Sequence, residues 1–283
     1  MSRYEERMKR IKWLEEARFG MFIHWGIYAI PARNEWMRSK EQVVPEEYYQ
    51  YFHEFNPKAC DMNELADLAV SAGMKYAIFT TKHHDGFCMF DSQYTEFKST
   101  NTKAKRDFVR EYVAAFRSRG IKVGLYYSLA DWEHPEYPAY GDANHPLRNH
   151  PEEKDKNRDF SKYLVYYQNQ LKELLTNYGK IDIIWFDGVY NEMVGEVWEA
   201  SKVEAMIRQL QPEIIINDRM SLNIQSADSE DTLTTGDYYT PECIIPVKKV
   251  TDCEGRDLLW ETCVSADDSW CHSIMPRRYR HSG

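Results

Sequence analysis

The sequence predicts an α/β protein built as a (β/α)8 barrel, and three observations lead to this fold class. Short runs of β-branched and aromatic residues alternate with longer helical segments, which is typical of a parallel sheet. The sequence contains neither GxGxxG nor GxxxxGK(S/T), the glycine-rich phosphate-binding motifs of the nucleotide-binding folds. A Rossmann fold therefore loses its main support. Polar and aromatic residues follow the strands at their carboxyl ends, where barrel enzymes gather their active sites.

Seven segments have the apolar composition of buried strands. They span residues 19–25, 76–81, 123–128, 181–187, 214–218, a weaker 234–239, and 258–262. Helical segments lie between them at 63–71, 105–119, 159–178 and 197–210, and several end next to a glycine, as helix C-caps prefer. This order predicts a repeated βα unit.

One connection, residues 131–157, is too long for an ordinary βα turn. It is rich in proline, histidine and charged residues. Two interpretations remain open for it, a lid over the site or a solvated excursion.

Composition narrows the classes of function. The chain has 36 Lys and Arg against 45 Asp and Glu, a formal charge of −9 that argues against a nucleic-acid partner. No uncharged apolar stretch reaches the roughly 18 residues that a membrane span needs. The first residues lack the apolar core of a secretory signal, and the six cysteines include no CxxC pair, so we expect a cytoplasmic protein with incidental thiols.

The fourth predicted strand carries the most informative pattern. Its period-2 alternation places Ile183, Trp185 and Asp187 on one face, with Asp187 last before a glycine. A carboxylate there would face the mouth of a barrel, although Asp is also a preferred helix N-cap. Trp185, on the same face, resembles a platform on which a sugar ring stacks.

A second carboxylate would have to come from elsewhere in the chain. Retaining glycoside hydrolysis needs a nucleophile and a general acid/base about 5–5.5 Å apart. The candidates are Glu35, Asp85, Asp237 and Glu242. Pro241 would hold its loop extended and present Glu242 over the mouth, whereas the alternative for Glu242 is an exposed loop acid.

Three histidines end the first two strands. His24 follows the first, and His83 and His84 follow the second, where imidazoles could bind sugar hydroxyls or a metal ion. Barrel metallohydrolases use an HxH pair on the first strand, which this sequence lacks. Adjacent His83 and His84 would also point to opposite faces of an extended strand, which disfavours a shared metal ion.

Together these motifs carry a resemblance to a known family. The segments FGMFIHWG, NEWM, TTKHHDGF, YYS, IIWFDG, NDR and GDYYTPE occur in order between about Arg18 and Trp270. In this combination the sequence resembles the catalytic domain of the glycoside hydrolase family 29 α-L-fucosidases.

The resemblance implies a retaining exo-hydrolase that removes terminal α-L-fucose from fucosylated glycans by double displacement, without a metal or organic cofactor. Motif by motif, Asp187 falls on the nucleophile and Glu242 on the acid/base. The positions that match binders of the fucose ring are His24, Glu35, Trp36, His83, His84, Tyr127, Trp185 and Arg219, with Tyr126 a substitute for Tyr127. Trp260 would add an aromatic wall around the C5 methyl group.

The sequence departs from the family at its end. In relatives the WET segment leads to a DSWGYN-like motif, a last barrel strand and often a β-sandwich, whereas here it leads to DSWCHSIMPRRYRHSG. We therefore expect residues 1–283 to form a single barrel domain that lacks its last strand and a C-terminal β-sandwich. Two functions stay open, an active fucosidase and a fucose-binding or weakly active module. We expect a homo-oligomer to cover the open edge.

Overall fold

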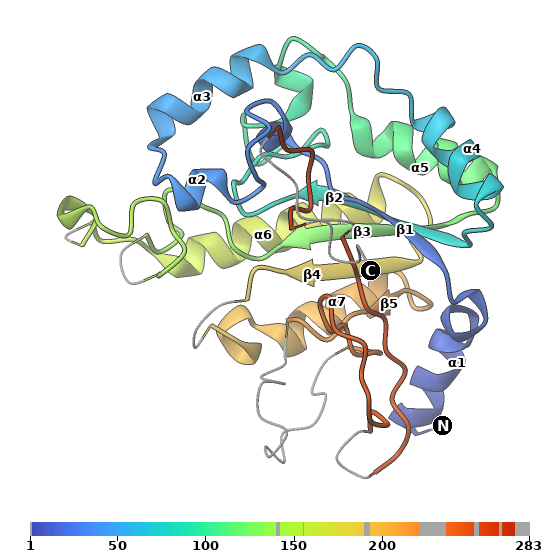
Figure 1. Cartoon of the computed structure of the whole chain (residues 1–283). Coiled ribbons are helices and arrows are strands. Elements are labelled where there is room, and N and C mark those ends of the chain that lie inside the picture. Colours follow the sequence, from blue (N-terminus) through green and yellow to red (C-terminus); the bar gives the residue numbers. More distant parts are fainter. Residues whose placement is uncertain are drawn as a thin grey trace.

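A parallel sheet forms the centre of the molecule (Figure 1). The computed structural model describes residues 2–139, 142–154, 156–189, 193–220, 236–251, 255–265 and 268–274. The sheet has five strands in the order β1-β2-β3-β4-β5. They are β1 Gly20–Ile23, β2 Tyr76–Lys82, β3 Lys122–Ser128, β4 Ile183–Asp187 and β5 Ile215–Ile216. Each lies within the range that the sequence predicts, or one residue beyond it.

Helices connect the strands, as parallel pairing requires. These connecting helices are α2 Met37–Lys40, α3 Pro45–Glu54, α4 Met62–Ser71, α5 Phe108–Ser118, α6 Phe160–Thr176 and α7 Ala200–Leu210, and one further helix, α1 Arg3–Ala17, precedes β1. Short 3-10 turns lie at Ile27–Ala29, Ser99–Asn101, Pro151–Glu153 and Gly195–Trp198. Aspartates 61, 107 and 159 cap α4, α5 and α6, because each side chain accepts a backbone N–H of the first turn.

The sheet continues beyond β5 through single bridges. Tyr238 pairs with Asn217 and Tyr239 with Trp260, both in parallel orientation. The predicted strands 234–239 and 258–262 are therefore present only as bridged segments, and residues 234 and 235 lie outside the described part. Too few backbone groups pair there to form a ladder. Further bridges beyond β5 join Glu242 to Cys263 in parallel and Thr251 to Asp257 in antiparallel orientation.

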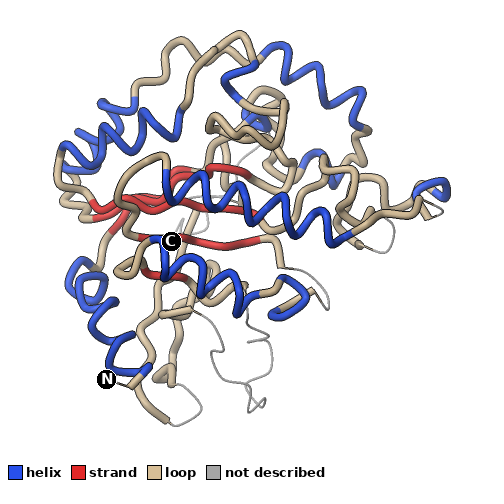
Figure 2. The backbone as a smooth tube through the Cα atoms, turned by 180° about the vertical axis from the view of Figure 1, so that it is seen from behind, coloured by secondary structure: helices blue, strands red, loops and turns tan. Residues whose placement is uncertain are grey.

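Alternate residues of the strands face two different cores. Ile183 and Trp185 point into the barrel interior with Tyr76, Ile78, Tyr126, Ile215 and Tyr238. Ile184 and Phe186 face outward to the helices. In Figure 1, α3, α4 and α5 lie above the sheet and α7 below it, and Figure 2 shows the same layers from behind.

Helix α1 closes the barrel at the amino ends of the strands. Its Ile11 and Leu14 are buried in the interior core, and Trp13 meets the ring of Tyr76 edge-on at the start of β2. Arg10 donates to Asp237 at 2.8 Å from the same helix. With this end plugged, access to the interior is left at the carboxyl ends.

The long connection after β3 packs against the rest of the chain. The main-chain oxygen of Asn144 accepts the Ser39 hydroxyl, and Arg148 donates to the main-chain oxygen of Ser39. Asp142 and His145 are buried. The described residues of this loop therefore form neither a free lid nor a solvated excursion.

Across the described ranges, none of the helices combines the length and the apolar character needed to cross a bilayer.

Candidate active site

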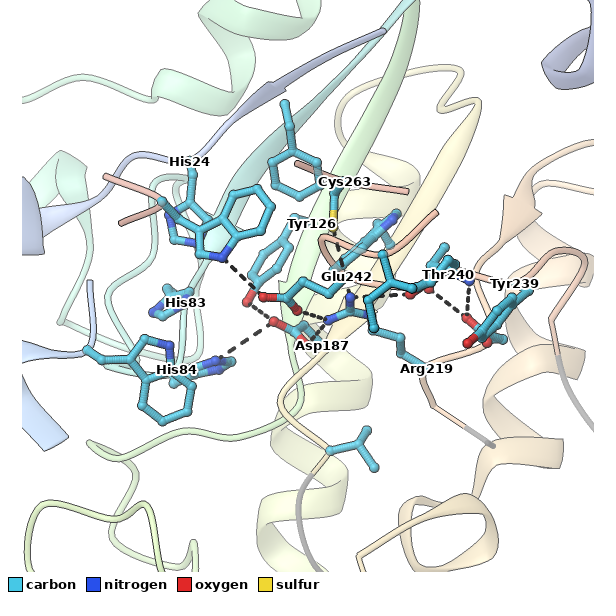
Figure 3. A pocket seen from close by; sticks show the side chains of 18 of the residues that line it. His24, His83, His84, Tyr126, Asp187, Arg219, Tyr239, Thr240, Glu242 and Cys263 are labelled. Atoms are coloured by element: carbon cyan, nitrogen blue, oxygen red, sulfur yellow. Dashed lines mark hydrogen bonds and ion pairs between the residues drawn. The ribbon is translucent and has the colours of Figure 1, made fainter. Parts of the chain in front are cut away.

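A pocket of about 700 Å³ opens at the carboxyl ends of the strands (Figure 3). Aromatic rings, imidazoles and the carboxylates of Asp187, Asp218 and Glu242 line it. They come from the ends of β1 to β5 and from the segments at 239–244 and 263–270. This is the position at which the sequence analysis expects the site.

Asp187 ends β4 with both carboxylate oxygens bound. The Tyr126 hydroxyl donates to Oδ2 at 2.7 Å, and Arg219 Nη1 donates to Oδ1 at 2.9 Å. Burial by itself would raise the pKa of Asp187, but Arg219, His84 and Tyr126 together outweigh it and hold that pKa below its usual value. Asp187 is therefore an ionised carboxylate at neutral pH.

The N-cap interpretation of Asp187 does not apply. The next 3-10 turn begins at Gly195 and the next α-helix at Ala200, several residues further along. Gly188 directly follows Asp187 with a φ of +79°, and a Cβ there would lie 2.6 Å from Ser128 Oγ. Glycine lets β4 turn away from β3 immediately after the carboxylate.

Glu242 lies across the pocket and shares a partner with Asp187. Arg219 Nη1 contacts Glu242 Oε2 at 3.0 Å and Asp187 Oδ1 at 2.9 Å. The distance between Oδ1 of Asp187 and Oε2 of Glu242 therefore cannot exceed the sum of these two contact distances. Trp270 Nε1 donates to the other oxygen of Glu242 at 3.1 Å, and the Glu242 side chain is 47% exposed.

The loop that carries Glu242 is fixed by Asp218. Oδ1 of Asp218 accepts both the main-chain N–H and the hydroxyl of Thr240, at 3.0 and 2.6 Å. Burial raises the pKa of Asp218 to about 6. Asp218 and Arg219 are adjacent, so one turn after β5 orients the loop and also binds its glutamate.

The three histidines are neutral donors and acceptors at neutral pH. Burial lowers the pKa of His24 and of His84 to about 4, and lowers that of His83 as well. Tyr28 and Ser128 bind the Nδ1 atoms of His24 and His84, at 2.8 and 2.6 Å. The buried Nδ1 of His83 has no hydrogen-bond partner within the described structure.

The expectation that His83 and His84 point to opposite faces is wrong. Both line the pocket, with ring centroids 3.9 Å apart. Strand β2 ends at Lys82 after a shift of register at Thr80–Lys82, so strand alternation no longer holds at the pair. Within the described ranges, no three His, Cys, Asp or Glu side chains are grouped to hold a metal ion.

Eight of the sequence-predicted residues meet in this pocket: His24, Trp36, His83, His84, Trp185, Asp187, Arg219 and Glu242. Tyr127 does not, because it points outward and donates to Gln170 Oε1 at 2.7 Å. Tyr126 takes its place, since consecutive residues of β3 face opposite sides. Trp260 is 37% exposed and does not line the pocket.

Glu35 does not line the pocket either, but it binds Trp270, which does. Its Oε2 accepts the main-chain N–H of Trp270 at 3.1 Å and the hydroxyl of Ser269 at 2.8 Å. The other candidate carboxylates are engaged elsewhere. Asp85 accepts the Tyr48 hydroxyl, and Asp237 is paired with Arg10 and Arg208.

Sequence reasoning missed the roles of Asp218, Tyr239, Thr240, Cys263 and Trp270 in this site. Trp270 stacks on His24 with ring centroids 6.1 Å apart, in addition to binding Glu242. The DSW segment that contains Trp270 could have indicated this role, but the sequence analysis considered only the residues that follow it.

Two close carboxylates, neutral imidazoles and aromatic rings at the mouth of a parallel α/β barrel define the barrel glycoside hydrolases. Comparison with known proteins gives the family. Residues 2–282 match the model described as alpha-L-fucosidase. This chain belongs to the α-L-fucosidase family.

Individual relatives agree with this assignment. The tissue alpha-L-fucosidase of Bos taurus is 31% identical over 281 residues, which are 91% of this chain and 54% of that protein. The structure of alpha-L-fucosidase isoenzyme 1 from Paenibacillus thiaminolyticus is 50% identical with a TM-score of 0.92, over 97% of this chain and 65% of that one. The AlfC enzyme from Lactobacillus casei, solved in complex with α-L-fucose product, is 29% identical with a TM-score of 0.79, over 96% and 83%.

The predicted fold class and family are confirmed by these matches. The chain spans about half the length of the curated relatives.

Proposed function

We propose that this chain hydrolyses terminal α-L-fucosides with retention of configuration, using Asp187 as the nucleophile and Glu242 as the general acid/base. The observation that carries the proposal is the single nitrogen of Arg219 that contacts both carboxylates, at 2.9 and 3.0 Å. A shared cation of this kind keeps the two carboxylates close together, which is compatible with the spacing of about 5–5.5 Å of retaining enzymes.

The first step would form a covalent ester. A carboxylate oxygen of Asp187 attacks the anomeric carbon, the bond from that carbon to the leaving oxygen breaks, and protonated Glu242 gives its proton to that oxygen. In the second step Glu242 removes a proton from water, whose oxygen attacks the same carbon and releases Asp187. Two inversions give net retention.

Arg219 suits both steps because it touches both carboxylates. Before the first step the negative charge is on Asp187 and Glu242 carries the proton. In the ester Asp187 is neutral and Glu242 is ionised, so the charge beside Arg219 is the same. One guanidinium thus stabilises the nucleophile first and the base afterwards, without moving.

The rest of the pocket suits a 6-deoxy sugar. Neutral His24, His83 and His84 can donate to and accept from hydroxyl groups without adding charge. Trp36 and Trp270 offer aromatic surface to a methyl group and a ring face, whereas Trp185 is only 2% exposed. A variant of the AlfC enzyme was solved with Fucα(1,6)GlcNAc, which makes fucosylated glycans the substrate class proposed for this chain. A binding module alone would have no use for two carboxylates in contact with one cation.

The product formed first tests the mechanism. We expect a chromogenic aryl α-L-fucoside to be hydrolysed, with the α-anomer of fucose visible by NMR before mutarotation. Initial release of the β-anomer would exclude the double displacement, and absence of turnover would exclude the hydrolase.

A further inference from the structure

Glu261 is a carboxylate of the barrel that the proposed reaction does not use. It follows Trp260 in the bridged segment beyond β5 and does not line the pocket. Buried aromatic side chains donate to both of its oxygens, and the buried Tyr238 also faces it. The Tyr76 hydroxyl donates to Oε1 at 2.7 Å, and Trp185 Nε1 donates to Oε2 at 3.2 Å.

The indole of Trp185 is the surface on which the site is assembled. The guanidinium carbon of Arg219 lies 4.3 Å from the centre of that ring. The ring of Tyr126 stacks on the same indole, with centroids 5.5 Å apart and planes 20° from parallel. Phe22 meets it edge-on at 5.3 Å.

Arg219 and Tyr126 are also the two side chains that donate to the oxygens of Asp187, at 2.9 and 2.7 Å. Both donors therefore pack against the indole of Trp185. The hydrogen bond from Trp185 Nε1 to Glu261 is a directional contact of that indole. Packing alone leaves a flat ring free to rock, whereas a bonded Nε1 sets its orientation.

We propose that Glu261 is a positioning residue that orients Trp185, and through it Arg219 and Tyr126, on Asp187. The inference rests on the proposed function of this site. Glu261 touches none of the reacting groups itself. A displacement near 1 Å of the groups that hold a nucleophile costs about 10²-fold in rate.

The direction in which the pKa of Asp187 shifts on removal of Glu261 distinguishes a positioning role of Glu261 from a purely electrostatic one. Asp187 faces Arg219, His84 and Tyr126, which keep its pKa low. If Glu261 acted as a charge, its removal would leave Arg219 more strongly paired with Asp187 and lower that pKa further. If Glu261 positions the donors, its removal loosens them and the pKa of Asp187 rises.

Three single variants and one double variant test this. Glu261→Ala should lower kcat about 10²-fold and move the acid limb of the kcat/KM profile to higher pH. Glu261→Gln keeps an oxygen for Trp185 Nε1 and an amide that can donate to the Tyr76 hydroxyl, so it should recover most of the loss. Trp185→Phe should match Glu261→Ala in the shift of the acid limb, and the double variant should shift it no further.

Glu173→Gln is the matched control, because Glu173 is a buried carboxylate in α6 that also accepts two hydrogen bonds, from Ser92 and Gln93. It should leave the acid limb in place. Equal losses in Glu261→Gln and Glu261→Ala, or an acid limb that stays or moves to lower pH in Glu261→Ala, would overturn the proposal.

A measurement that does not depend on turnover distinguishes the positioning role of Glu261 from the proposed hydrolase activity. The indole N–H resonance of Trp185 can be assigned in a 15N spectrum by its loss in Trp185→Phe. It should shift in Glu261→Ala and stay close to its place in Glu261→Gln. If the parent chain turns over no fucoside the function fails, whereas an active parent with an unshifted indole resonance in Glu261→Ala refutes the positioning role alone.

Discussion

The hydroxyl of Tyr126 donates to Oδ2 of Asp187 at 2.7 Å, from the neighbouring strand of the sheet. Tyr126 is paired in register with Trp185, two residues before Asp187. The long phenol side chain spans that offset along the strands. The donor therefore belongs to the rigid sheet and not to a loop, which suits a bond that fixes a reacting carboxylate.

Removal of this hydroxyl should change the ionisation of Asp187. A hydrogen bond to a charged group is worth about 1.5–3 kcal/mol, or about one to two pKa units. We expect Tyr126→Phe to raise the pKa of Asp187 and to shift the acid limb of kcat/KM upward by about that amount. Tyr127→Phe is the control, since Tyr127 binds Gln170 on the other side of the sheet and should leave the limb unchanged.

Loss of the proposed nucleophile should be the most damaging single change. Asp187→Gly should reduce turnover of an aryl fucoside by about 10⁴-fold or more, as loss of one member of a catalytic unit does. Added azide should restore turnover and yield the fucosyl azide of opposite anomeric configuration, because a small anion fills the space of the carboxylate. A variant that keeps near-parental rates would refute the assignment.

The cost of losing Glu242 should depend on the leaving group. Glu242→Ala should slow substrates with poor leaving groups about 10²–10⁴-fold, since they need a proton, and change the first step of activated aryl fucosides far less. Rates on a series of fucosides with leaving groups of graded pKa measure this. An equal loss across the series would assign Glu242 a binding role.

Buried His84 should make stability depend on pH. Its pKa is about 4 in the folded chain and near 6.5 in the unfolded chain, so below pH 6.5 the unfolded chain binds more protons. This contribution to the free energy of unfolding is complete above pH 6.5 and falls by about 3 kcal/mol as pH drops to 4. Denaturant unfolding of His84→Gln at several pH values should show a shallower loss than the parent.

We propose that copies of this chain associate, and exposed aliphatic side chains beyond β5 support it. Ile244, Ile245, Val247 and Ile274 are 64, 68, 97 and 73% exposed. Light scattering at micromolar concentration should give a mass above that of one chain. Ile245→Asp with Val247→Asp should lower the mass, whereas Val165→Asp, at an exposed residue of α6, should not. A stable monomer in the parent chain would refute the idea.

The sequence predicted the parts of this site that depend on local periodicity. Asp187 and Trp185 follow from alternation along one strand, and Arg219 and Glu242 follow from motifs at strand ends. Tyr127 was preferred to Tyr126 from motif matching, although alternation and the pairing of β3 with β4 select Tyr126. His83 and His84 lie in the site as predicted, but they do not point to opposite faces, because a shift of register cannot be read from composition.

Contacts between distant segments escaped the sequence analysis for a different reason. Glu35 was assigned to the sugar, but it binds the main chain at Trp270, 235 residues later. Likewise, only tertiary contacts decide that the connection after β3 packs on Ser39. Neither of these contacts can be inferred from hydrophobic periodicity, helix caps or motif spacing, which are the features that a single sequence provides.

The contact between Glu35 and Trp270 also bears on the order of events during synthesis. Every strand from β1 to β5 precedes residue 217, so the sheet and its carboxylate Asp187 can form while later residues are still being translated. The donor for Glu242 Oε1 is added only when residue 270 leaves the ribosome and docks on the loop after β1. A nascent chain can therefore have its nucleophile in place before the Trp270 donor to Glu242 has been synthesised.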